Sequence, residues 1–453
     1  MLLEPSIWCT SDNMVKKMMY GVEGVAKAIP KAYWGVDGVA RKIKKAYYGV
    51  GGVAKEIFGG ARSYLHGGVS TFTHLVGDLT EEFISNGNAY TLDLDEFLVQ
   101  VKKSDDVPLY VYLDGELVGT IESSGEQTIS LSGRTSTLMA KGTVEVKIVS
   151  ESTYNLGSLT FHQNWSYAGS SKSTDNVTCK STISAATLSD NIEELYGSTF
   201  EGATFSKLDL PPSVKSIGQG VFQNCKNLTY LDLHNVESIG AYAFNSCHNL
   251  IVNFTEGLHT IGPSAFRYCH QLVDVVIPES VSFIGLQAFS DCNNLVSFSK
   301  TAGSASLGME ALYNCAKLTS AHIEGVNEIG INAFYYTPLS EVFLSDALTT
   351  IKKGAFYNTD LTSVTIPRSV TLIEAAAFAA CTDLTAVTFK HTVSDQLEMF
   401  MTTDITTEDT FPAFYMNSTN MHNITIYHNG NPTVLNYDWG ICMVSATFVQ
   451  ESL

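Results

Sequence analysis

The chain has 453 residues, of which 45% are hydrophobic, and a formal net charge of −19. This length allows two or three domains and this apolar content supports continuous cores, so a disordered chain is not expected. The charge is uneven, because residues 14–58 hold nine Lys/Arg against three Asp/Glu, which gives +6 and leaves −25 for the rest. Since an acidic body of this size repels nucleic acid and anionic membranes, we expect no nucleic-acid partner.

Targeting segments are not visible in the sequence. Residues 1–13 contain Glu4 and Asp12 but no basic residue, and no run of seven or more apolar residues follows them. A secretory signal peptide needs both features. No stretch approaches 18 consecutive apolar residues, so we expect no transmembrane segment.

A short repeat with a period of 14 residues comes first, at residues 20–27, 34–41 and 48–55. Its pairs Asp37-Gly38 and Gly51-Gly52 match two-residue hairpin turns, which predicts short β-hairpins or a β-meander with one cationic face. The phrase GVxGVAKxIKKAYxGV resembles short repeats in phage and prophage structural proteins of Gram-positive bacteria. That resemblance implies attachment of residues 14–58 to a virion or tail assembly.

The middle of the chain alternates apolar and polar residues with the period of a strand, at residues 90–95, 109–113, 128–131 and 144–148. Asp114-Gly115 predicts a hairpin between two of these strands. Five to seven such strands make a small β-sandwich. The polar run at residues 169–174 then predicts a linker.

A longer repeat occupies the second half, from Phe200 to Trp439. An Ile-Gly pair, an Ala-Phe pair and a Cys recur at fixed spacing, and the step between successive Phe positions is 22 or 23 residues. Between these phrases lies a strand signature, as at residues 228–233, 272–277 and 361–366. Each rung is predicted to be a strand, a turn and a short helical or irregular return that buries the Ala-Phe pair. Neighbouring rungs about 4.8 Å apart bury a continuous core.

The fold class predicted is therefore mainly β. It consists of a leucine-rich-repeat solenoid of about nine 22–23-residue rungs, preceded by a small β-sandwich and a short N-terminal β-repeat segment. The expected divisions are 1–66 for the basic Gly-Val repeat segment, 67–168 for the sandwich, 169–198 for the linker and N-terminal cap, 199–440 for the solenoid and 441–453 for a C-terminal tail.

Six of the nine cysteines stand three residues after the Phe or its equivalent Leu312, and Thr337 and Thr359 fill the same place in two rungs. A position that accepts Cys or Thr indicates a small, buried site. Disulfides between rungs are one alternative, but the threonine rungs would interrupt their pairing. A metal site is another, suggested by Cys247-His248 and Cys269-His270. Adjacent residues in an extended segment point to opposite sides, so these pairs would not converge on a metal.

The recurring phrase SIGxxAFxxCxxLxxVxIPxSV resembles the BspA-like leucine-rich repeat family of bacterial surface proteins. Near-matching rungs cover about half of the chain. The resemblance implies a binding or adhesion scaffold displayed at a surface.

Two places are candidates for ligand recognition. One is the row of side chains that faces outward from the parallel strands, and the other is a 14-residue insertion within residues 391–409 of the last rung, because long loops on a rigid scaffold often bind ligands. The candidate ligand-binding residues are Tyr230, Asp232, Asn253, Asp274, His322, Glu341, Phe343, Thr365, Met399 and Phe400.

Motifs of nucleotide binding, zinc hydrolysis, serine hydrolysis and paired-cysteine chemistry are absent from the sequence. We therefore expect no enzyme activity, no cofactor and no metal. The expected function is recognition of a host-surface protein or glycan through the solenoid, by a chain attached to a phage or prophage-derived particle. The alternative is a secreted or cell-surface BspA-like adhesin. The expected location is thus a virion, the cell surface or the extracellular space, and the sequence is compatible with a homo-oligomer.

Overall fold

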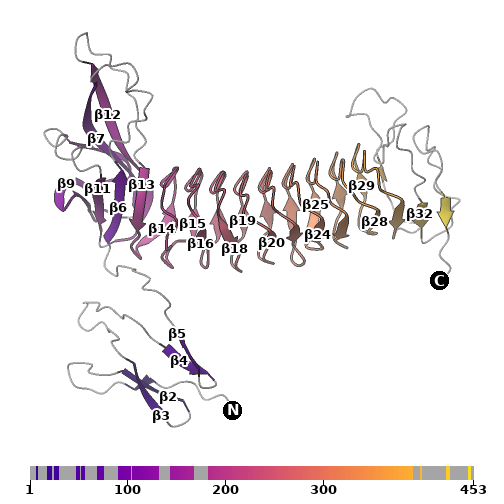
Figure 1. Cartoon of the computed structure of the whole chain (residues 1–453), viewed down its shortest axis with the longest axis horizontal. Coiled ribbons are helices and arrows are strands. Elements are labelled where there is room, and N and C mark those ends of the chain that lie inside the picture. Colours follow the sequence, from indigo (N-terminus) through magenta and orange to yellow (C-terminus); the bar gives the residue numbers. More distant parts are fainter. Residues whose placement is uncertain are drawn as a thin grey trace.

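The computed structural model describes residues 105–131, 143–150, 152–167 and 182–390. Outside these ranges it describes only the strands themselves. These described residues contain β-strands, turns and bends but no α-helix. They form an array of rungs with a β-sandwich at one end (Figure 1). The chain is therefore a mainly β protein built on a solenoid, as predicted.

The sandwich contains eight strands in two sheets. The first sheet has the order β10-β7-β12 and the second β13-β6-β11-β8-β9. The two sheets enclose Phe72, Phe97, Val146 and Phe161, which are fully buried. The strands are β6 (Val69–Leu75), β7 (Tyr90–Lys103), β8 (Leu109–Leu113), β9 (Glu116–Ile121), β10 (Gly125–Ser130), β11 (Thr143–Val149), β12 (Tyr154–Tyr167) and β13 (Thr182–Thr187).

This count exceeds the five to seven strands expected from alternation, because β6 and β13 also join the sandwich. The predicted hairpin at Asp114-Gly115 is confirmed, since it connects the antiparallel strands β8 and β9. Both of its turn residues have positive φ, 46° and 87°, as a type I′ turn requires.

The sandwich continues directly into the solenoid. Strand β12 pairs in parallel with β14 (Ile192–Leu195), and β14 pairs in parallel with β15 (Ser216–Ile217). One 13-stranded sheet therefore runs from the sandwich along the solenoid. A single hydrophobic core extends through both parts.

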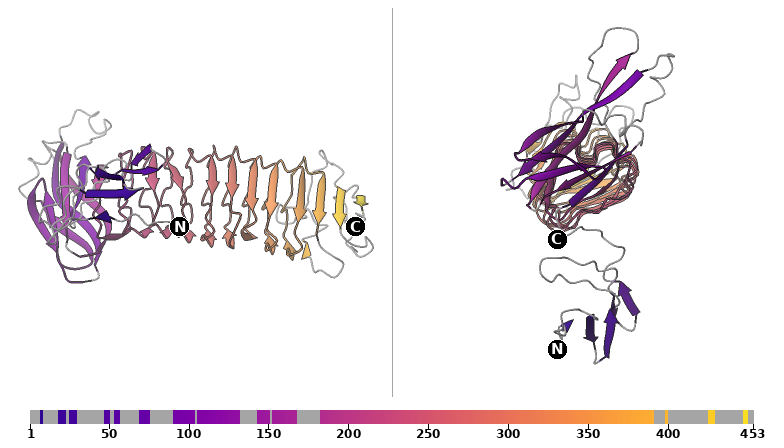
Figure 2. Two further views of the ribbon diagram at one scale, coloured as in Figure 1. Left: turned by 90° about the horizontal axis from the view of Figure 1, so that it is seen from below. Right: turned by 90° about the vertical axis from the view of Figure 1, so that its left-hand side faces the viewer.

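Two parallel strands in each rung build the sides of the solenoid (Figure 2). The first kind is short and carries the Ile of the repeat; after β15 come β17 (Ser238–Ile239), β19 (Thr260–Ile261), β21 (Phe283–Ile284), β23 (Ala305–Leu307), β25 (Val326–Ile329), β27 (Thr350–Ile351), β29 (Leu372–Ile373) and β31 (Glu398–Met399). The second kind carries the Leu-rich signature and comprises β16 (Tyr230–Asp232), β18 (Ile251–Asn253), β20 (Asp274–Val276), β22 (Ser297–Ser299), β24 (Ser320–Ile323), β26 (Glu341–Leu344), β28 (Ser363–Ile366), β30 (Ala386–Phe389), β32 (Thr425–His428) and β33 (Thr447–Val449).

The return segment of each rung, which carries the Ala-Phe pair, is an irregular series of turns. Its backbone is nevertheless tied to the next rung by three N–H to O=C hydrogen bonds that all point the same way, as from Tyr242, Phe244 and Ser246 to residues 263, 265 and 267. The first and third donors have positive φ, 57° and 62° in this rung. The left-handed residues turn these N–H groups toward the next rung, so the return is held without a helix.

The Phe residues of successive rungs stack in the core. Phe222, Phe244 and Phe266 have nearly parallel rings with centroids 5.2 and 5.1 Å apart. The stack continues to Phe289, is interrupted by Leu312 and resumes from Phe334 to Phe378.

The six repeat cysteines are free and fully buried, which confirms the prediction that they are small core residues. Each thiol donates to the carbonyl oxygen of the Phe on the preceding rung, as Cys269 does to Phe244 at 3.2 Å. Thr337 and Thr359 instead donate to the Phe carbonyl of their own rung, at 2.8 and 3.1 Å. Both Cys and Thr fit this position because each combines a small volume with a hydrogen-bond donor.

The repeat glycine allows close approach of one rung to the next. A Cβ placed on Gly285 would lie 2.5 Å from the backbone nitrogen of Pro263 and 2.6 Å from the carbonyl carbon of Gly262. Gly240, Gly262, Gly308 and Gly330 meet the preceding rung in the same way. Lys352 stands at this position in a later rung, where the column of glycines ends.

The irregular turn at residues 301–306 is organised by Lys300, whose side chain is fully buried. Its ammonium donates to the carbonyl oxygens of Pro278, Glu279 and Ala302 at 3.0, 3.1 and 2.5 Å. The Lys300 ammonium thus holds this turn, where two other rungs have the pairs Ile277-Pro278 and Ile366-Pro367. Burial lowers the pKa of Lys300.

Within residues 1–66 the structure describes five short strands, β1 (Ile7–Trp8), β2 (Met18–Val22), β3 (Val25–Ile29), β4 (Tyr47–Val50) and β5 (Val53–Glu56). The hairpin predicted at Gly51-Gly52 is confirmed by the antiparallel pairing of β4 with β5. Residues 37–38, where another hairpin was predicted, lie outside the described residues. No helix within the described part of the chain is long and apolar enough to cross a membrane.

Candidate functional site

The residues predicted to face outward from the second sheet do so. Tyr230, Asn253, Asp274, Glu341 and Thr365 are exposed, because inward positions of the same strands are taken by the core leucines and valines. Asp232 and His322 are half-buried, and Phe343 is exposed. We call this row of outward side chains the strand-face stripe.

Only some members of the stripe lie together. His322 and Phe343 occupy paired positions on β24 and β26 and stack with ring centroids 4.3 Å apart. Asp232 pairs in register with Asn253. Tyr230 lies on β16, several rungs from Phe343, so the stripe is a long surface and not one pocket.

The remaining predicted residues fall near the end of the described solenoid. Met399 lies on β31, which pairs with β29. Phe400 lies outside the described residues, as does most of the insertion at 391–409. Their part in ligand binding stays a prediction.

A second surface, formed by the return segments of the middle rungs, gathers more polar and aromatic groups. Equivalent positions of successive rungs lie side by side there, because each return segment is hydrogen-bonded to the next. We call this surface the return-face patch; it consists of Arg267, Tyr268, Leu286, Gln287, Asp291, Met309, Glu310, Tyr313, Asn314, Tyr335, Tyr336 and Tyr357.

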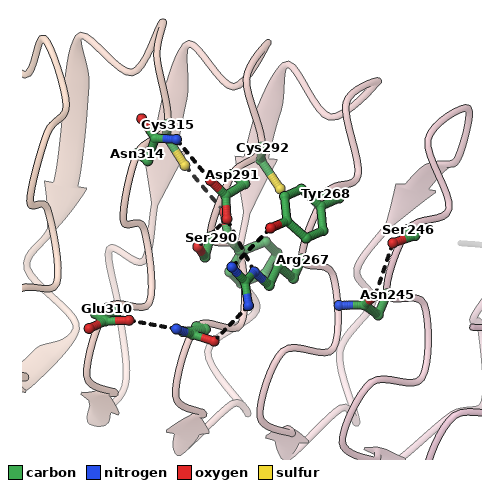
Figure 3. Close-up of polar contacts among 12 residues, drawn as sticks. Asn245, Ser246, Arg267, Tyr268, Ser290, Asp291, Cys292, Glu310, Asn314 and Cys315 are labelled. Atoms are coloured by element: carbon green, nitrogen blue, oxygen red, sulfur yellow. Dashed lines mark hydrogen bonds and ion pairs between the residues drawn. The ribbon is translucent and has the colours of Figure 1, made fainter.

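An ion pair between rungs forms one half of the patch (Figure 3). Asp291 is almost fully buried and accepts hydrogen bonds from Arg267 Nε at 3.1 Å, from Asn314 Nδ2 at 2.8 Å and from Ser290 Oγ at 2.9 Å. A buried carboxylate needs such partners, since an unpaired charge in this position would be strongly destabilising. Three successive rungs are thereby joined at one side chain.

Arg267 is held in place by further contacts. Its Nη1 donates to Gln287 Oε1 at 3.1 Å, its Nη2 donates to the Tyr268 hydroxyl at 3.0 Å, and Gln287 Nε2 in turn donates to Glu310 Oε2 at 2.6 Å. The guanidinium also lies over the Tyr268 ring, 4.7 Å from its centroid. The polar half of the patch is therefore preorganised.

A column of tyrosines forms the other half. Tyr313, Tyr335 and Tyr357 stack with centroids 5.8 and 4.6 Å apart, and the ring of Tyr336 stands at 87° to that of Tyr335. Tyr336 is 48% exposed. Next to these columns, Leu286 and Met309 are exposed apolar residues that directly precede Gln287 and Glu310.

Two carboxylates and one guanidinium act on Tyr313 in the tyrosine column. Burial raises the pKa of Tyr313, and the nearby Asp291, Glu310 and Tyr336 raise it further, while Arg267 acts in the opposite direction. Ion pairs in the area join Arg267 to Asp291 at 3.1 Å and Lys352 to Glu328 at 2.7 Å. Among the described residues Glu310 has no ion-pair partner.

The return-face patch was not among the sites predicted from the sequence. A usable signal exists, because Tyr follows the Phe or Leu of the repeat in three consecutive rungs, at Tyr313, Tyr335 and Tyr357. Strand alternation does not reveal it, since that rule gives the direction of side chains in strands and not in turns.

The repeat thiols are poor candidates for chemistry. Burial raises the pKa of Cys292 to about 12 and that of Cys381 to about 11, and the pKa of Cys269 and Cys315 lies well above the ordinary value. The thiolate is the nucleophile and metal ligand, so these groups are held in the inactive form. Within the described ranges, no group of three or more His, Cys, Asp and Glu residues is arranged around a metal position.

Comparisons with known proteins place the repeats in a family. The family described as "BspA type Leucine rich repeat region" matches at residues 172–296, 259–385 and 305–429, which together span more than half of the chain. A comparison with curated proteins gives no significant match.

Similar solved structures are bacterial leucine-rich repeat proteins. One is from Bacteroides ovatus, with 19% identity over 58% of this chain and 60% of that chain, at a TM-score of 0.39. Another is the pneumococcal vaccine antigen PcpA, with 16% identity over 58% and 78% of the two chains and a TM-score of 0.32. A third is the T. pallidum leucine-rich repeat protein, with 23% identity over 47% and 79% and a TM-score of 0.24. The chain thus spans less than two thirds of the length of the first of these.

Proposed function

Because this chain belongs to the BspA-type leucine-rich repeat family, we propose that it is a non-enzymatic binding protein that recognises a surface protein or glycan through its solenoid. The observation that carries this proposal is the preorganised return-face patch, in which Arg267 and Asp291 are fixed by neighbouring rungs beside a column of tyrosines. Tyr and Arg dominate the binding energy of protein recognition sites. The buried thiols, in contrast, serve the core.

The place of action proposed is a surface, either of a cell or of a phage-derived particle. The 14-residue repeats support the second form, because residues 14–58 are basic while the rest of the chain is acidic, so the two parts suit different partners. In that form residues 14–58 attach the chain to a tail or similar assembly and the solenoid faces outward. In the first form the chain is a surface or extracellular adhesin.

Arrays of surface proteins and glycans test the recognition. The full chain is applied beside a variant with both solenoid surfaces altered, Tyr336→Asn with Phe343→Ser. We expect the full chain to bind members of one array and the double variant to lose at least tenfold in affinity. Equal binding by both proteins, or no binding to either array, would overturn the proposal.

A deletion tests the attachment. A chain without residues 14–58 should still bind the array but no longer co-sediment with phage particles produced by the strain that encodes it. Co-sedimentation by the deleted chain, or none by the full chain, contradicts the particle form and leaves the adhesin form.

A further inference from the structure

The return-face patch also indicates the kind of partner, an inference that rests on the proposed function. The patch includes two exposed apolar side chains, Leu286 and Met309, and the half-exposed ring of Tyr336. Phe283, three residues before Leu286, extends this apolar area onto β21 and is 43% exposed. Met and aromatic residues are enriched at protein interfaces.

The packing of the tyrosines favours a polypeptide over a sugar. Tyr335 lies between Tyr313 and Tyr357 with ring planes only 15° and 11° from parallel, so its faces are covered by its neighbours. A pyranose that stacks on a ring needs an open face. A sugar also needs many hydrogen-bonding groups. Arg267 and Asp291 already bond to one another, so fewer of their donors and acceptors are available to a sugar.

The charge of the patch and of its surroundings favours a basic partner. Residues 182–390 contain ten Lys/Arg and nineteen Asp/Glu, a net charge of 10 − 19 = −9. Within the patch Arg267 is neutralised by Asp291, whereas Glu310 accepts a hydrogen bond from the neutral amide of Gln287. Glu310 and Tyr336 both act on the pKa of Tyr313, so a segment that covers Tyr313 reaches the carboxylate and the exposed aromatic ring together.

We propose that the return-face patch docks a polypeptide segment of a partner protein in which a Lys or Arg side chain stands beside apolar ones. The apolar side chains cover Leu286 and Met309. The basic side chain lies beside Glu310, and another side chain of the segment packs against the exposed ring of Tyr336. The docked segment packs against the columns of stacked side chains, and the core stays closed.

An array of synthetic 12-residue peptides that vary independently in net charge and apolar content tests this inference with the full chain. We expect retention of peptides that are both basic and apolar, with weaker binding as salt rises. Tyr336→Asn should weaken that binding about tenfold, as removal of a central aromatic contact does, and Glu310→Gln should remove the preference for basic peptides.

Tyr242 provides the matched control. It is 42% exposed and has a φ of 57°, as Tyr336 does, but it lies outside the patch. Asn tolerates this left-handed conformation, so both substitutions should leave the fold intact. Tyr242→Asn is expected to bind peptides as the unaltered chain does.

Three results would overturn the inference. They are equal retention of acidic and basic peptides, an equal effect of Tyr242→Asn and Tyr336→Asn, and binding to the surface-protein and glycan arrays that Tyr336→Asn leaves unchanged. In the last case the proposed function stands and only this docking surface fails. If neither the peptides nor the arrays bind, both proposals fail.

Discussion

At the scale of single residues, the thiol of Cys and the hydroxyl of Thr both donate a hydrogen bond to a Phe carbonyl oxygen in this core. The Phe244 carbonyl oxygen already accepts the Cys247 N–H at 3.1 Å, so the side-chain donor adds a second hydrogen bond, worth about 0.5–1.5 kcal/mol. Cys269 satisfies the Phe244 carbonyl across a rung boundary, whereas Thr337 satisfies the Phe334 carbonyl within its own rung. The side chain at this place therefore supplies a donor as well as a small volume.

Substitution of Cys269 separates these two properties. Cys269→Val keeps a small apolar side chain but removes the donor, so we expect the free energy of unfolding to fall by about 1 kcal/mol. Cys269→Thr keeps a donor and should remain closer to the unaltered chain. Urea denaturation followed by circular dichroism measures both. A valine variant as stable as the threonine variant would mean that volume alone matters.

The sandwich core contains a histidine whose burial makes the protein sensitive to acid. His74 is fully buried, with its ring at 80° to that of Phe161 and 88° to that of Phe97. Burial lowers its pKa from 6.5 to about 3. The folded state therefore binds fewer protons than the unfolded state between these values, and stability is lost as the pH falls below about 6.5.

Replacement of this histidine should remove that dependence. Between pH 7 and pH 5 the unaltered chain is expected to lose about 2 kcal/mol of stability that His74→Leu does not lose. Thermal unfolding at several pH values measures the difference. Parallel slopes for the two proteins across this range would show that His74 is not the group responsible.

At the scale of elements, the rung is the unit that the sequence specifies most strongly. The Ile-Gly, Ala-Phe and Cys positions are predictable because each meets its own counterpart on the next rung, so one physical requirement is repeated down the chain. The outward direction of Tyr230 and Phe343 follows from strand alternation. The return-face patch does not, since its residues lie in turns whose side-chain directions depend on left-handed φ angles and on the neighbouring rungs.

The contact between rungs at the repeat glycine is a feature of this scale. Gly285→Ala would place a methyl group within 2.6 Å of the backbone of residues 262–263, so the rungs must separate. We expect a loss of about 1–3 kcal/mol, as for overpacked cores, measured as a shift of the urea midpoint.

Lys352→Ala is the control at the equivalent position of a later rung, where a side chain already stands. It removes an exposed ion pair with Glu328 and should cost under about 1 kcal/mol. Equal losses in the two variants would argue against close backbone approach as the reason for glycine.

At the scale of the whole molecule, the sandwich covers the first rung. The parallel pairing of β12 with β14 brings Tyr154 and Leu156 into register with Ile192 and Leu195, so both parts share one sheet and one core. The sequence predicted a sandwich and a solenoid but not this continuity. The pairing joins strands with residues 168–191 between them, and no local pattern specifies such a partner.

Truncations test this arrangement. Removal of residues 1–181 takes away β12 and exposes the buried side chains of Ile192, Leu195 and Phe200, so we expect a lower melting temperature and binding of a hydrophobic dye. Removal of residues 1–66 takes away β1 to β5, which pair only among themselves within the described strands, and should leave the melting temperature unchanged. A stable, dye-free chain without residues 1–181 would show that the solenoid needs no such cover.

The return segments give the solenoid a direction. Three N–H groups of each rung, from Ser198 to Asn358, donate toward the C-terminal neighbour, so the peptide dipoles of the return segments add along the axis as they do in a helix. The carbonyl end of this array lies toward the sandwich and the N–H end toward the last rungs. The array is therefore polar along its length: the sandwich covers its carbonyl end, where β12 pairs with β14, and its N–H groups point toward the last rungs.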